Sequence, residues 1–135
     1  MRVFLDTDVL VSAFATRGLC ADLLRSVLVE HELLIGEVVL EELRRALREK
    51  LGVPENTVGE IERLLREQQV VSEPEPLPDI PLRDSDDLRV LASAINGDTD
   101  ALVTGDHDLL AIAGQSPIKI LDPRGFWTLL RDRPP

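Results

Sequence analysis

The stretch Arg2–Leu10 constrains the fold most, because its character changes abruptly within a few residues. Val3–Leu5 is an apolar run that is too short for a helix and rich in β-formers. It stops at the triplet Asp6-Thr7-Asp8, after which apolar residues resume at once. In open α/β sheets, ligands bind beyond the carboxyl ends of the strands, where the connections diverge. We therefore interpret Asp6 as the anchor of a metal site whose other carboxylates lie farther along the chain.

The rest of the chain alternates short apolar runs with amphipathic segments of helical period. Further strands are expected at 33–35, 69–72, 101–104 and 118–121, and helices at 9–15, 19–31, 37–51, from 53, at 86–95, at 107–113 and from 123. Strands that are separated by helices are typical of a parallel sheet. The pattern predicts a three-layer α/β/α fold, with a central, mostly parallel five-stranded sheet and helices on both faces.

A length of 135 residues predicts a single domain over 1–135. Four prolines between residues 73 and 81 exclude a helix or a paired strand there. We interpret 73–81 as an extended surface crossover, because neither side of it alone makes a complete sheet. Residues 132–135 are expected to be a frayed tail.

Charge and hydropathy limit the classes of function that are compatible with this sequence. No apolar run approaches the roughly 20 residues that span a membrane, and acids at positions 6 and 8 interrupt any signal-peptide pattern, so a cytoplasmic location is expected. The net charge of −10 argues against nucleic-acid binding by bulk electrostatics. It does not exclude a nuclease, because divalent ions in a carboxylate site invert the local charge.

Two further aspartates lie beside strand ends. Asp106 follows the strand expected at 101–104, and Asp87 lies in the first turn of the helix that precedes this strand. Taken alone, the 84–87 cluster reads as helix capping and Asp106 as turn chemistry. The coincidence with Asp6 favours one shared site at the carboxyl edge of the sheet.

Helical periodicity distinguishes two candidates for a fourth acid. At about 100° per residue, the apolar stripe of the helix at 37–51 centres between Val39 and Leu43. Glu42 lies about a quarter-turn from that centre, whereas Glu41 falls nearly opposite. We therefore expect Glu42 to face the sheet. A group of carboxylates without cysteine or histidine favours Mg²⁺ or Mn²⁺, and suits metal-assisted phosphoryl transfer.

These motifs resemble those of PIN domains. The segment Val3–Ala13 is similar to their opening, which usually reads D-T-N-V-L where this chain has D-T-D-V-L. Glu42 matches their second acid and Asp87 their third, and Val103–Leu110 is similar to their closing T-G-D-x-D-L-L motif. The match runs in order along nearly the whole chain. One departure is Asp8, which stands where asparagine is usual.

The resemblance implies a Mg²⁺- or Mn²⁺-dependent endoribonuclease that hydrolyses single-stranded RNA, most similar to the toxin subunits of bacterial and archaeal toxin–antitoxin pairs. It also implies a homodimer, and a separately encoded antitoxin as partner. The implied acidic site is Asp6, Glu42, Asp87 and Asp106, of which Asp6, Asp87 and Asp106 hold metal and Glu42 positions or activates water. The implied supporting residues are Thr7 and Thr104, with Asp8, Asp84 and Asp108 as further polar groups or extra ligands.

Two alternatives remain open on the sequence. One is a PIN-fold regulatory or protein-binding module with weak or no catalysis. The other is a phosphatase that forms an aspartyl-phosphate on Asp6 with Asp8 as acid/base, although such enzymes usually have glycine where Val9 stands. Candidate phosphate contacts are Arg17, Arg44, Arg45, Arg48 and Arg124.

Overall fold

The central strand of the fold is the apolar run at the start of the chain. The computed structural model describes residues 1–132, and β1 (Arg2–Leu5) lies in the middle of a sheet of order β3-β2-β1-β4-β5. Every pairing in this sheet is parallel. The other strands are β2 (Glu32–Gly36), β3 (Gln69–Val71), β4 (Ala101–Val103) and β5 (Lys119–Leu121). Val3–Leu5 are fully buried, as expected for a strand covered on both faces.

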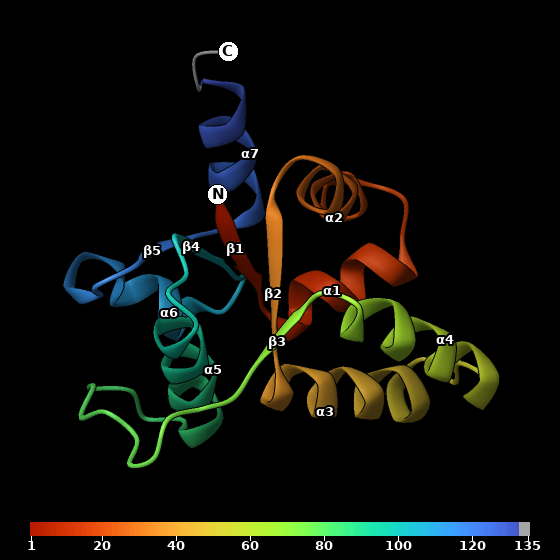
Figure 1. Ribbon diagram of the computed structural model, residues 1–135, viewed down its shortest axis with the longest axis horizontal. Coiled ribbons are helices and arrows are strands. Elements are labelled where there is room, and N and C mark those ends of the chain that lie inside the picture. Colours follow the sequence, from red (N-terminus) through yellow and green to blue (C-terminus); the bar gives the residue numbers. More distant parts are fainter. Residues whose placement is uncertain (133–135) are drawn as a thin grey trace.

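Helices cover both faces of the sheet. Figure 1 shows α1 to α4 on one side and α5 and α6 on the other, which confirms the predicted three-layer α/β/α fold. The helices are α1 (Thr7–Ala15), α2 (Leu19–Glu30), α3 (Glu37–Arg45), α4 (Glu55–Arg66), α5 (Ser85–Asn96), α6 (His107–Ala111) and α7 (Pro123–Arg131). No helix of the described part is long and apolar enough to cross a membrane.

The neighbouring strands β1 and β4 create the point at which the connections diverge. The chain leaves β1 into α1, on one face, and leaves β4 toward α6, on the other (Figure 1). The two strand ends stay paired beyond the last strand residues, because Asp6 N donates to Val103 O at 3.0 Å. Side chains that follow β1 and β4 therefore meet at the crevice where α/β sheets bind ligands.

The helix expected at 37–51 changes its geometry partway. It is α-helical only to Arg45 and continues as a π-helical turn over Ala46–Lys50, closed by a hydrogen bond from Leu51 N to Ala46 O at 3.2 Å. Gly52 then turns the chain with φ of +62°. Apolar residues keep the same spacing through both segments, so the sequence pattern does not separate them.

The proline-rich segment contains no helix or strand. Its start is held against α5, where Arg89 Nε pairs with Glu73 at 2.7 Å and Asn96 Nδ2 donates to Ser72 O at 2.9 Å. Buried side chains before and after this segment belong to one hydrophobic cluster. Of the expected frayed tail, residues 133–135 lie outside the described residues.

Candidate active site

A cavity of about 540 Å³ lies at the carboxyl ends of β1 and β4. Its lining includes all the acids that the sequence singles out as catalytic: Asp6, Glu42, Asp87 and Asp106. They come from the end of β1, from α3, from the first turn of α5 and from the end of β4. Residues far apart in the sequence are thus brought to one opening.

Asp6 is the most buried of these acids, at 7% exposed. It caps α1, because its Oδ1 accepts from Thr7 N at 2.7 Å, and its Oδ2 accepts from Thr104 Oγ1 at 2.7 Å. Burial first, and then the charges of Asp8 and Glu42, raise the pKa of Asp6 to about 7, although the hydrogen bonds from Thr104 and Thr7 act in the opposite direction. Thr104 is fully buried, so the Asp6 carboxylate is held in one orientation.

Glu42 faces Asp6 from α3, as helical periodicity predicts, while Glu41 is exposed. Its Oε2 accepts from Thr7 Oγ1 at 3.1 Å. Its Oε1 is buried and has no hydrogen-bond partner within residues 1–132. Burial is also the main cause that raises the pKa of Glu42. The two threonines therefore each orient one acid, and one oxygen of Glu42 is left for a ligand.

Asp106 begins α6. Its Oδ1 accepts from Asp108 N at 2.9 Å and from Leu109 N at 3.1 Å, and its own N–H donates to Thr104 Oγ1 at 3.0 Å. Across from it, the pKa of Asp87 is raised to about 7 by burial first, and then by the charge of Asp106. Asp106 therefore has the local role expected of an aspartate at this turn, and it also lines the cavity.

The tightest group of acids differs from the expected metal-binding trio. Within the described chain, Asp87, Asp106 and Asp108 each offer a carboxylate oxygen within 4.8 Å of the others. Asp6 lines the same cavity but is not in this group. Asp84 lies outside the cavity lining and caps α5, because its Oδ1 accepts from Asp86 N at 2.7 Å.

Asp8 links the two strand ends. Its Oδ2 accepts from Gly105 N at 2.7 Å, which ties the start of α1 to the residue after Thr104. Gly105 has no side chain to obstruct this contact, since a Cβ there would lie 2.5 Å from Asp8 Oδ2. An asparagine could accept the same bond, so the extra charge of Asp8 is not needed for it.

A divalent cation fits these residues. The donors are carboxylate oxygens, which suit Mg²⁺ or Mn²⁺. Burial and like charges raise the pKa of Asp6 and of Asp87 to about 7, so ionising both at neutral pH costs free energy. A bound cation would offset this cost. The unpartnered Glu42 Oε1 points to a missing partner in the same cavity.

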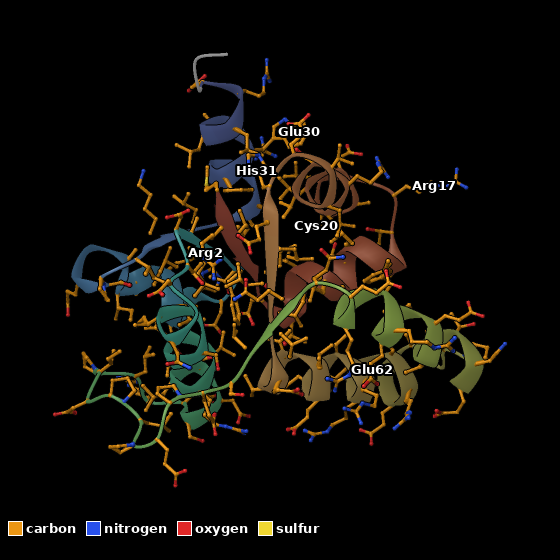
Figure 2. The ribbon with its side chains drawn as sticks, viewed as in Figure 1. Arg2, Arg17, Cys20, Glu30, His31 and Glu62 are labelled. Carbon is orange, nitrogen blue, oxygen red and sulfur yellow. The ribbon has the colours of Figure 1, made fainter. Side chains whose placement is uncertain are left out.

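Three other polar residues of the lining were not predicted from the sequence, namely Ser12, Thr16 and Lys50. Helical spacing could have identified them, because residues four apart lie on the same face of a helix. Ser12 and Thr16 follow Asp8 by four and eight residues, and Lys50 follows Glu42 by eight. The arginines named as phosphate contacts do not line the cavity. Arg44 pairs with Glu62 at 3.3 Å, and Arg48 with Glu55, while Arg17 extends outward from the turn after α1 (Figure 2).

Comparisons with known proteins agree with this geometry. The sequence model of the PIN domain matches residues 2–108, whereas no curated protein sequence matches the chain. The fold is similar to a VapBC2 structure from Rickettsia felis, with a TM-score of 0.62, 16% identity, and coverage of 90% of this chain and 98% of that one. It is also similar to a VapBC-1 structure from nontypeable Haemophilus influenzae, with a TM-score of 0.64, 16% identity, and coverage of 92% of this chain and 99% of that one. A third similar structure is VapC20 of Mycobacterium tuberculosis, described as a sarcin-ricin loop cleaving toxin. Its TM-score is 0.59 and its identity 15%, with coverage of 81% of this chain and 93% of that one.

Proposed function

This chain belongs to the PIN domain family, and on that premise we propose that it is a Mg²⁺- or Mn²⁺-dependent endoribonuclease acting on single-stranded RNA. The observation that carries the proposal is the convergence of Asp6, Glu42, Asp87 and Asp106 on one cavity. None of these acids forms an ion pair within residues 1–132. Such a cluster is suited to a cation and a phosphate brought in from outside.

Each residue has a distinct task in this proposal. Asp6, Asp87 and Asp106 hold the metal, with Asp108 at hand beside them. When bound, the cation activates water and offsets the negative charge that develops on the phosphate. Glu42 takes the proton of the attacking water, because its carboxylate lines the cavity and its raised pKa makes it a better base. Thr7 and Thr104 hold Glu42 and Asp6 in place.

We further propose that the protein is the toxin of a toxin–antitoxin pair and acts in the cytoplasm as a homodimer. The likeness to VapBC proteins and to the toxin VapC20 supports an antitoxin protein as partner. The antitoxin would be a separately encoded chain, so the direct test of this part is to look for a small gene beside this one and to co-express its product with this protein.

The activity is tested by cleavage of an end-labelled single-stranded RNA pool with and without Mn²⁺. Asp6→Asn and Glu42→Gln should each lower the initial rate by at least about 100-fold, since each removes a group that acts on metal or water. Glu41→Gln is the matched control, because it removes a neighbouring but exposed acid of α3. Its rate should stay within about twofold of wild type.

The alternatives have their own signatures in the same experiment. Phosphatase activity that survives Glu42→Gln, with a trapped phosphoaspartate on Asp6, would replace the ribonuclease with the phosphatase. Absence of cleavage together with no Mn²⁺-dependent rise in the thermal midpoint would leave a non-catalytic module.

A further inference from the structure

One cation lines the acidic cavity. Lys50 is the only lysine or arginine among the described residues of the lining, and its ammonium group forms no hydrogen bond or ion pair with any residue between 1 and 132. We propose that Lys50 is a positioning residue that binds an RNA phosphate next to the scissile one. This inference rests on the proposed RNA substrate, and adds to it how the strand is held.

The π-helical turn aligns Lys50 with Glu42. In an α-helix, four residues advance about 400°, so a residue four positions on lies about 40° off the original line. From Glu42 to Ala46 this drift accumulates. Between Ala46 and Lys50 the turn is π-helical, so each residue advances by a smaller angle than in an α-helix. Four residues then fall short of a full revolution, and Lys50 comes back toward the line of Glu42. Glu42, Ala46 and Lys50 therefore share one wall, as their common place in the lining shows.

The opposite wall comes from α1. Asp8, Ser12 and Thr16 line the cavity at the same four-residue spacing, and α1 packs against α3. Ala15 and Ala46 also belong to the lining, and their small side chains leave the space between the helices open. Along each wall the carboxylate comes first in the sequence, at Asp8 and Glu42, and it is followed by the hydroxyl groups of Ser12 and Thr16 on one wall and by the ammonium of Lys50 on the other.

We assign the ammonium to a different phosphate from the one at the acids. Along the helix axis, the backbone of Lys50 lies on the order of 10 Å beyond that of Glu42, whereas oxygen ligands of Mg²⁺ lie about 2.0–2.1 Å from the ion. A neighbouring phosphate along the strand is the matching partner for a lysine acting as a point charge. Because the chain carries a net charge of −10, a local cation matters more here than in a basic nuclease. Such a contact sets the register of the strand without reading its sequence.

The test is equilibrium binding of a fluorescein-labelled single-stranded RNA oligonucleotide, followed by anisotropy. The Asp6→Asn chain is used with and without Lys50→Ala, so that the RNA is not consumed. Lys50→Ala should raise Kd about 5- to 10-fold and reduce the slope of log K against log salt by about 0.7. Lys50→Arg should keep both values near those of the parent.

Lys119 supplies the matched control, because it is the only other lysine of the chain and is exposed on β5, outside this cavity. Lys119→Ala should leave Kd and the salt slope unchanged. In chains that retain Asp6, Lys50→Ala should raise KM and leave kcat within about twofold, since the contact is made in both ground and transition states.

The outcomes separate this inference from the proposed activity. An unchanged salt slope and KM in Lys50→Ala, with cleavage intact in wild type, overturn the role of Lys50 alone. A fall in the metal-free thermal midpoint of Lys50→Ala without any change in slope assigns Lys50 a structural role and also overturns it. Lys50-dependent binding without cleavage overturns the ribonuclease and keeps the RNA contact. Failure of every chain to bind RNA overturns both.

Discussion

The two ends of β1 carry opposite electrostatic arrangements. At the amino end, the Arg2 guanidinium donates to Glu32 Oε2 at 2.9 Å and to Gln69 Oε1 at 3.2 Å. It also donates to the carbonyl oxygens of Gly97 at 2.6 Å and Asp98 at 3.0 Å. One cation is thus surrounded by acceptors, all of them supplied by the chain itself.

The carboxyl end, four residues away along the same strand, has the charges without the partner. Asp6 stands there with Glu42, Asp87 and Asp106 around one cavity, and the pKa of Asp6 is raised to about 7. The fold therefore completes its own interactions at Arg2 and leaves them incomplete at Asp6. A closed network is a structural feature, whereas an open one is where a ligand gains binding free energy.

The largest effect that tests this contrast is the dependence of metal-free stability on pH. The pKa of Asp6 is about 7, against 3.8 for an unperturbed aspartate, so the native state binds more protons than the unfolded state between about pH 4 and pH 7. The free energy of unfolding should therefore fall as pH rises through this window, at up to about 1.4 kcal/mol per unit for one group. Asp87 shifts in the same direction, although its partial exposure reduces its contribution. Urea denaturation in EDTA at several pH values measures the slope.

Mn²⁺ and Asp6→Asn provide the controls for that measurement. Mn²⁺ should restore stability more at pH 8 than at pH 5, because the ion competes with protons for the same carboxylates. Asp6→Asn should flatten the pH profile. Stability that does not change between pH 5 and pH 8 without metal would contradict the view that the carboxyl end is electrostatically open.

A smaller effect is expected at the amino end. Arg2→Ala removes several hydrogen bonds, of which the one to Gly97 O is partly buried, and should lower the free energy of unfolding by about 2 kcal/mol. The Mn²⁺-induced rise in the thermal midpoint should be unchanged, since Arg2 does not line the cavity. Arg25→Ala is the matched control, because Arg25 forms only an exposed i,i+3 pair with Asp22 and should cost under about 0.5 kcal/mol. Weaker Mn²⁺ binding in Arg2→Ala would show that the two ends are coupled.

The smallest expected effect is at Asp8. Asp8→Asn keeps an oxygen that accepts from Gly105 N–H and removes one charge beside Asp6, whose pKa that charge raises. Metal-free stability should rise by less than about 1 kcal/mol, and Mn²⁺ affinity measured by calorimetry should fall a few-fold. Asp8→Ala loses the Gly105 bond as well, and should be less stable than Asp8→Asn. Equal stability of the two variants would contradict the linking role of Asp8.

Much of the site was predictable because its signals are local. A strand that ends at Asp6 and another that ends before Asp106 are visible as changes in hydropathy, and parallel strand ends meet at one edge. The choice of Glu42 over Glu41 followed from the angle between successive helical residues. The closeness of Asp108 to Asp87 and Asp106 was less accessible, because it depends on the conformation of the turn at Asp106 and on side-chain rotamers.

The succession of strands and helices along the chain, the buried strand that ends at Asp6, and the family could all be predicted from the sequence. Each of them depends on the period of apolar residues or on the spacing of motifs, and both can be read from the sequence directly. Only the packed structure shows that Thr7 and Thr104 hold the acids, that Asp8 in the first turn of α1 accepts from Gly105 N, and that Lys50 reaches the cavity after a π-helical turn. These depend on contacts between segments up to about 100 residues apart, and on backbone geometry that apolar spacing does not encode. The physical reason is that hydrophobic burial specifies which face turns inward, while distances between polar groups are set only once the packed elements meet.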